Sequence, residues 1–271
     1  MSKKVLSLVL LSFAFLVLCP NDLAQKGYFR DTVIRGGDDL SFHIFSRGNG
    51  DKVPTRINRL LQLYELYALA KPPYSKNIFR QATANDGSIY GGKVAITSKV
   101  YSNNSRILSL GFYETSSGAT THYWNKYYNF NSGNGDRIEL KDLFTDEGYK
   151  FFSKLAFKIR SAKYRGEVRK KIEPQYQESF METVGCLESD NLQGYYIHQG
   201  AIVIDGDGCL IKAEKVEGLD MEVTIRSKFF STYLNNYGKA VFGFVRADIR
   251  SFAQSICPSF LKERSTARID S

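Results

Sequence analysis

The sequence has few of the side chains that most often mark an enzyme or a metal site. Its 271 residues include only three histidines, His43, His122 and His198, and four cysteines. No histidine stands in a nucleophile elbow, a zinc-protease helix or a Cys/His zinc pattern. The segment "YGGKVAIT" lacks the first glycine and the Lys-Ser/Thr ending of a phosphate loop. We therefore expect no metal and no cofactor, and the usual signs of acyl transfer and nucleotide binding are missing.

Long apolar runs are also scarce, and the one candidate lies at the start of the chain. Lys3 and Lys4 precede the largely apolar segment Val5–Leu18, which the polar "CPNDLAQ" closes. This segment fits a secretory signal but is shorter than the ~18–20 residues that span a bilayer. We therefore predict a signal peptide over residues 1–24 and an exported protein, periplasmic or extracellular.

The processing site is less sharply defined than the signal itself. Cleavage after Ala24 would make Gln25 the first residue, although Asp22 then lies three positions before the cut. Lipid attachment at Cys19 is the less favoured alternative, because Leu18 stands where lipoprotein signals have a small residue. We expect Gln25 to begin the exported protein.

The chain has an excess of basic residues. Its net charge of +9 becomes +8 when residues 1–24 are removed with Lys3, Lys4 and Asp22. A basic protein is attracted to anionic partners such as lipid head groups or acidic envelope polymers. Export makes nucleic acid a poor partner, and the oligomeric state stays open.

Three cysteines remain after processing, so one is left over if two pair. In an oxidising compartment Cys186 and Cys209 could form a disulfide, which would contribute roughly 3 kcal/mol in the chain-entropy model. Cys257 would then be free or buried.

The arrangement of apolar residues predicts an α+β fold with antiparallel sheets and segregated helices. Residues 25–52 read as short strands, and residues 53–71 as one amphipathic helix with Tyr64, Tyr67 and Leu69 on its apolar face. Three strand-like runs follow, and alternation puts Val94 and Ile96 with Val100 on one face, to match Leu108, Leu110 and Phe112.

Further helices and strands are expected towards the C-terminus. Thr145 and Asp146 should cap a helix whose Phe151, Leu155 and Ile159 recur at four-residue steps. Strand-like runs are Tyr195–His198, Ala201–Ile204, Cys209–Ala213 and Met221–Ile225, followed by a short helix that ends at Gly238 and a last helix before Pro258. The expected divisions are a smaller N-terminal α+β region over 25–90, an α+β domain over 91–250, and a C-terminal helix and tail over 251–271.

The most basic segment of the chain is residues 154–171, which belong to the first of these helices and its tail. It contains Lys158 and Arg169 among eight cations and a single acid, Glu167. Such a strip can contact an anion or an anionic membrane surface, but solvated basic helix faces are common. We keep Lys158 and Arg169 as secondary candidates for ligand binding.

The stretch "HYWNKYYNFNSGNGD" has the densest aromatic content. Alternation places His122, Trp124, Lys126, Tyr128 and Phe130 on one face, and Tyr123, Asn125, Tyr127 and Asn129 on the other. "NSGNGD" should reverse the chain, so that Ile138 and Leu140 return against Trp124, Tyr128 and Phe130. Tyr123, Tyr127 and His122 are then the candidates for a wet aromatic shelf that contacts a ligand, and cross-strand packing is the alternative.

A pair of acids, Asp205 and Asp207 in "VIDGDGCL", offers a possible general acid and base. The other acids of a calcium loop are missing, and flanking apolar runs favour a hairpin turn. Hydrolysis of cell-wall polymers with such acids is the second functional hypothesis.

The run from Ile107 to Ile159 resembles the RsiV-like domain of unknown function, a module of bacterial envelope proteins. The matching parts are the strand Leu108–Leu110, the loop Gly118–His122, the segment Asn129–Phe144 and "YYIHQGAIVI", within about Val94 to Val245. The loop departs from the family pattern, since "GATTH" inserts two threonines before His122.

The resemblance implies an extracytoplasmic α+β recognition module without catalytic residues. In anti-sigma factors a related ectodomain senses lysozyme, and in cell-wall deacetylases it accompanies a separate catalytic domain. Lysozymes are cationic, so a charge of +8 opposes that encounter. We therefore expect a non-enzymatic binding protein for a cell-wall glycan or an envelope protein.

Overall fold

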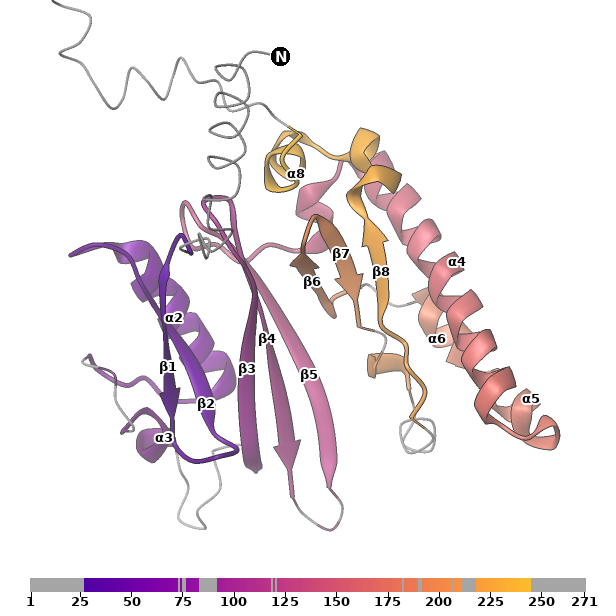
Figure 1. Cartoon of the computed structure of the whole chain (residues 1–271), viewed down its shortest axis with the longest axis horizontal. Helices are drawn as coiled ribbons and strands as arrows, with labels where there is room; N and C mark the ends of the chain where they lie inside the picture. Colours follow the sequence, from indigo (N-terminus) through magenta and orange to yellow (C-terminus); the bar gives the residue numbers. More distant parts are fainter. Residues whose placement is uncertain are drawn as a thin grey trace, which may run out of the picture.

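The computed structural model describes residues 27–72, 74, 77–82, 92–117, 119, 121–181, 183–189, 192–205, 207–210 and 218–244. Antiparallel sheets and separate helices make up this part of the chain, which confirms the α+β fold (Figure 1). The predicted signal peptide, Cys19, Cys257 and the predicted segment 251–271 lie outside the described residues. Among the described helices, none is both long and apolar enough to cross a membrane.

The N-terminal region begins with an antiparallel hairpin of β1 (Arg30–Arg35) and β2 (Ser41–Ser46), as the short apolar pieces predicted. Helix α2 (Lys52–Glu65) starts at Asp51, whose side chain accepts a hydrogen bond from the N–H of Val53. A short helix, α3 (Asn77–Ala82), follows.

Helix α2 ends six residues before the predicted boundary, and this corrects part of the apolar face. Tyr67 has a φ of 53°, a left-handed conformation that cannot continue an α-helix. Tyr64, Tyr67 and Leu69 are exposed. The buried face of α2 includes Ile57 and Leu61, and also the carboxylate residue Glu65.

The expected meander is formed by β3 (Lys93–Asn103), β4 (Ile107–Ser116) and β5 (His122–Asn131), in that order. Ile96, Leu108, Leu110 and Phe112 are buried as predicted. Val94 is not, because the register shifts between Lys93 and Ala95. Such a bulge exchanges the faces, so that Lys93 points inward and Val94 outward.

The segment after β5 differs from the predicted return strand. The turn does form, with the N–H of Asn131 donating to the carbonyl of Asp136 at 2.8 Å. Pairing with β5 is limited to one bridge, between Phe130 and Arg137, and a 3-10 helix takes over at Leu140–Leu143. Ile138 and Leu140 join Ile107 in a second core, away from Tyr128 and Phe130.

Helix α4 (Asp146–Lys171) is the longest of the described elements, and it is capped by Thr145, which accepts from the N–H of Gly148 as expected. Its buried face is set one residue away from the predicted one. Phe152 and Ala156 are fully buried, whereas Phe151 is 37% exposed and stacks on Tyr233. Two short helices, α5 (Gln177–Phe180) and α6 (Thr183–Ser189), follow.

The second sheet has the order β6 (Tyr195–His198), β7 (Ala201–Ile204) and β8 (Val223–Arg226). The predicted strand at 209–213 is not seen where it is described, because Asp207–Cys209 is a 3-10 turn. Cys209 is bonded to Cys186 of α6. Helix α8 (Asn236–Val241) starts where a helix was expected to end, since Asn235 caps it by accepting from the N–H of Gly238.

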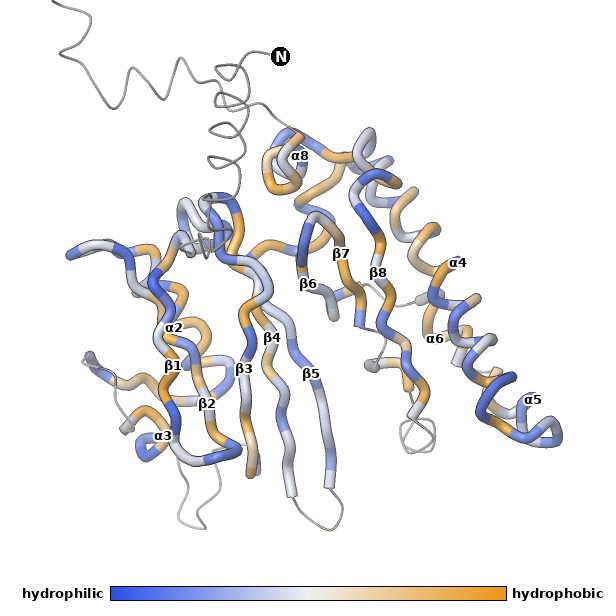
Figure 2. The backbone as a smooth tube through the Cα atoms, viewed as in Figure 1, coloured by the Kyte–Doolittle hydropathy of each residue, from blue (hydrophilic) through white to orange (hydrophobic). Residues whose placement is uncertain are grey.

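Among the described residues, two large hydrophobic cores join most of these elements, and two smaller clusters lie at the C-terminal half of α4 and between the two sheets. The first joins α2, β1 and β2 to the meander through residues such as Phe42, Leu61 and Phe112, so packing does not break at the predicted division near residue 90. The second lies between α4, α8 and the second sheet, and includes Phe152, Ile202 and Phe230. Figure 2 shows β7 coloured hydrophobic along its length, in keeping with its four buried residues.

The second sheet meets the meander through polar contacts at strand β6. Ser109 of β4 accepts from the N–H of Ile197 at 3.0 Å, and Ser102 of β3 donates to the carbonyl of Ile197 at 2.7 Å. Asn129 of β5 donates to the carbonyl of Tyr195 at 2.9 Å. Three successive strands of the meander therefore each supply one side chain to the edge of β6.

Candidate functional site

Strand β5 has two faces with different surroundings, and the sequence alternation predicted which residues lie on each. Tyr128 and Phe130 belong to the first core, beneath α2. Tyr127 packs with Tyr196 and Val203 of the second sheet. The two faces therefore contact the two halves of the molecule.

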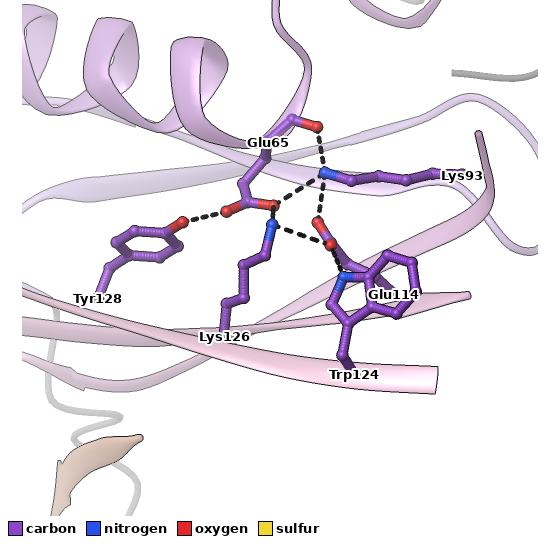
Figure 3. A network of polar contacts seen from close by, with 6 residues as sticks. All are labelled: Glu65, Lys93, Glu114, Trp124, Lys126 and Tyr128. Atoms are coloured by element: carbon purple, nitrogen blue, oxygen red, sulfur yellow. Dashed lines mark hydrogen bonds and ion pairs between the residues drawn. The ribbon is translucent and has the colours of Figure 1, made fainter. Parts of the chain in front are cut away.

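The face towards α2 holds four charged side chains in a closed arrangement (Figure 3). Lys93 lies 3.1 Å from the carboxylate of Glu65 and 2.6 Å from that of Glu114. Lys126 lies 3.2 Å and 3.1 Å from the same two carboxylates. Tyr128 donates a hydrogen bond to Glu65, and Trp124 donates one to Glu114. Trp124 and Lys126, predicted on the same face as Tyr128 and Phe130, thus belong to a polar cluster.

Burial makes the proton balance of this cluster unusual, because the side chains of Glu65 and Glu114 are fully buried and only Lys126 reaches solvent. Burial raises the pKa of Glu114, and its hydrogen bond and repulsion with Glu65 raise it further. Burial opposes ionisation of Glu65 too, but the hydrogen bond from Glu114 and the charge of Lys93 lower the pKa of Glu65 overall. Glu65 is therefore the carboxyl that ionises first.

On the opposite face of β5, the side chains bind Asp205, the residue that directly follows β7 of the second sheet. Tyr127 donates its hydroxyl to Asp205 at 2.8 Å, and the amide of Asn125 donates to the same oxygen at 2.9 Å. The ring of Tyr127 lies over Gly111 of β4, where an added Cβ would come within 3.0 Å of it. Glycine at 111 thus gives Tyr127 the space to reach Asp205.

A cleft between the two sheets opens beside Asp205. It has a volume of about 240 Å³, and three acids are among its lining residues: Asp205, Asp220 and Glu222. Tyr196 donates to Glu222 at 2.9 Å, and Lys163 of α4 donates to Asp220 at 2.7 Å. The remaining walls come from the following residues: Tyr113, Asn125, Tyr127, Leu210, Leu219 and Met221.

Three tyrosine rings stack on one another where the meander meets the second sheet. The ring of Tyr196 lies 3.7 Å from that of Tyr101 and 5.1 Å from that of Tyr127, measured between centroids. Burial, followed by the charge of Asp205, raises the pKa of Tyr127 far above its usual value. Burial likewise raises the pKa of Tyr101 and of Tyr196. These phenols stay protonated at neutral pH, so they can donate hydrogen bonds but not act as bases.

The structure separates the predicted shelf residues. Tyr123 is 67% exposed and His122 is exposed, whereas Tyr127 is only 7% exposed and its hydroxyl is bound to Asp205. Lys158 and Arg169 are exposed on α4. Asp205 lies at the cleft, and the position of the Asp207 side chain is not described. An open shelf of three neighbouring rings is therefore not formed, and the ligand roles of these residues stay predictions.

Several polar residues of both faces were missed by the sequence argument. Glu65, Lys93 and Glu114 were not singled out, because no local pattern pairs a helix residue with residues of two strands. The signal that was present is alternation itself: Glu114 is on the same face as Phe112 and Leu110, where a charge must find a partner. Glu222 offered no such signal.

Among the described residues no three His, Cys, Asp or Glu side chains gather as metal ligands would. The acids of the cleft and their tyrosine neighbours are instead suited to hydrogen bonding with hydroxyl groups.

Comparisons with known proteins add an overall likeness. Neither protein-family profiles nor curated proteins match the sequence. Two solved structures of the DUF3298 family resemble the fold, one from Bacteroides fragilis and one from Pseudomonas aeruginosa. The first has 14% identity and a TM-score of 0.49, covering 80% of this chain and 94% of its own. The second has 13% identity and a TM-score of 0.48, covering 77% and 93%. This likeness concerns shape alone, and the RsiV-like resemblance stays a prediction.

Proposed function

We propose that the protein is an exported, non-enzymatic binding protein that holds a hydroxyl-rich glycan of the cell envelope in the cleft between its two sheets. The observation that carries this is the carboxylate of Asp205, fixed by Tyr127 and Asn125 in a cleft that also contains Asp220 and Glu222. Carboxylates accept hydrogen bonds from sugar hydroxyls, and aromatic side chains pack against sugar rings.

The size and charge of the cleft narrow the ligand. Its volume of about 240 Å³ is below the ~300–1,000 Å³ of sites for drug-sized ligands, so it fits one sugar ring or the end of a chain. Three carboxylates repel anions at close range, although the whole chain is basic. A neutral N-acetylated sugar therefore suits the cleft better than an acidic one.

Export is part of the proposal and is supported by two independent features. Residues 1–24 have the pattern of a secretory signal. The disulfide between Cys186 and Cys209 is a bond that persists in oxidising compartments and is rare in the cytosol. Mass spectrometry of the protein from cells should give a chain that begins at Gln25 and carries this bond. A full-length, reduced chain would contradict export.

Calorimetric titration with chito-oligosaccharides and pull-down with purified peptidoglycan test the ligand. We expect saturable binding that weakens at least tenfold in Asp205→Asn and Glu222→Gln, since hydrogen bonds to charged groups contribute about 1.5–3 kcal/mol. Asp38→Asn, an exposed acid in the turn between β1 and β2, is the matched control and should bind normally.

A turnover assay on the same peptidoglycan separates binding from hydrolysis. We expect no release of soluble fragments. Release that Asp205→Asn abolishes would refute a non-enzymatic role. Binding to an envelope protein but to no glycan would keep the binding role and reject the sugar.

A further inference from the structure

The outer side of α4 carries a row of cations that the proposed glycan site does not use. Figure 1 shows α4 at the edge of the molecule, beyond the second sheet, and Figure 2 shows its C-terminal turns as largely hydrophilic. Five exposed side chains form the row, which we call the basic stripe: Lys150, Lys154, Lys158, Arg165 and Arg169.

The stripe is nearly straight. At 100° per residue, its members fall within about a quarter to a third of a turn, and 19 residues span about 28 Å. The buried residues Phe152 and Ala156 lie on the opposite side of the helix from the three lysines. Towards the C-terminus the buried face turns, so that Ser161 and Val168 lie on the Lys150 side of the stripe. The surface that the five cations share is therefore centred on Arg165 and Lys158.

The stripe is also unpaired. Within the described part of the chain, none of its five side chains forms an ion pair, whereas Lys163 pairs with Asp220 and Lys171 pairs with Glu167. The sequence has no acid between Lys150 and Glu167. Like charges four residues apart destabilise a helix by about 0.2–0.5 kcal/mol per pair. The arrangement lowers the stability of α4, which is the cost expected when a surface serves binding.

We propose that the basic stripe docks the protein on a bilayer that contains anionic phospholipids. A long, convex row of cations meets a flat surface along its whole length, and each Lys or Arg near an anionic leaflet adds about fivefold to the partition coefficient. Phe151 is 37% exposed beside the stripe, and a partly exposed ring next to cations suits the interfacial region. A soluble polyanion would pair with the cations but would offer no apolar region for the ring of Phe151.

Vesicle co-sedimentation tests this with the exported protein at 50 mM and 500 mM salt. Vesicles of phosphatidylcholine with one quarter phosphatidylglycerol should bind the protein at low salt and release it at high salt. Lys154→Glu with Lys158→Glu should lower the partition coefficient by on the order of 25-fold or more. Circular dichroism verifies that the variant is folded.

The matched control changes the same charge on another helix. Lys52→Glu with Arg59→Glu reverses two exposed cations of α2, and it should change the partition coefficient by less than threefold. If the partition coefficient fell equally in both double variants, binding would depend on the total charge of the protein, and the role of the basic stripe would be refuted. Binding to soluble long-chain polyphosphate, but not to anionic vesicles, would refute the proposal that the stripe docks on a lipid bilayer. The glycan titration is unaffected by either result, so the two proposals fail separately.

Discussion

The two faces of strand β5 place acids in opposite situations. On the side of α2, Glu65 and Glu114 are removed from water and are held by two lysines. On the side of the second sheet, Asp205 is held by neutral donors beside an open cleft. The buried, paired charges link helix α2 to the meander. The charge of Asp205, which is held by neutral groups at a cleft, remains able to attract a ligand.

The largest effect should follow removal of Lys93. Lys93→Met leaves two buried carboxylates with one cation, and breaking a buried pair in this way costs about 3–5 kcal/mol. Urea unfolding would measure the loss. Lys99→Met, on the exposed side of the same strand, should change stability by less than about 0.5 kcal/mol. Similar values for the two variants would mean that the cluster does not hold α2 to the meander.

A neighbouring pair of tyrosines compares the two faces directly. Tyr128→Phe removes the hydroxyl that donates to Glu65 and should lower the free energy of unfolding by about 1.5–3 kcal/mol. Tyr127→Phe removes one of the two donors to Asp205, and the hydrogen bond from Asn125 remains. The free energy of unfolding should therefore fall by only about 1 kcal/mol or less. Glycan binding should instead fall only in Tyr127→Phe. The reverse pattern would exchange the roles assigned to the faces.

The junction between the sheets offers a smaller effect. Ser109→Ala leaves the N–H of Ile197 without its acceptor, which costs about 1–3 kcal/mol for a buried group. Hydrogen exchange should also speed up at Ile197 while the amides of α2 keep their protection. Uniform loss of protection would show that the sheets unfold as one unit.

The smallest effect is a change with pH. Because the pKa of Glu114 is raised, the folded state binds more protons than the unfolded state above pH 4.5, so this group lowers stability as pH rises through that window. Glu65 acts in the other direction: its lowered pKa gives stability above pH 4.5 that is lost as pH falls. In urea unfolding at a series of pH values, Glu114→Gln should therefore gain stability relative to the natural chain as pH rises above 4.5. A constant difference would contradict the raised pKa.

The sequence predicted most of the strands and the faces of the central one. Alternation placed Tyr128 and Phe130 in a core, and Thr145 marked the start of α4. Periodicity failed to predict the buried face where the pattern shifts by one residue. The bulge after Lys93 exposes Val94, and the buried face of α4 begins at Phe152 rather than Phe151.

The site was less predictable than the fold. Asp205 and Tyr127 were each singled out, but their contact joins residues 78 apart in the chain, and no local pattern reports such a distance. Glu65 ends a helix whose boundary depends on the conformation of Tyr67. The position of Glu222 in the cleft results from tertiary packing alone.

The serines and asparagine that meet β6 have a consequence for assembly. The outward backbone groups of Tyr195 and Ile197 are occupied by Gln193, Asn129, Ser109 and Ser102. An unoccupied strand edge is a template on which another chain can add and aggregate. The meander thus acts as a cover for this edge, and a partner that extended the second sheet by strand addition would have to approach from β8.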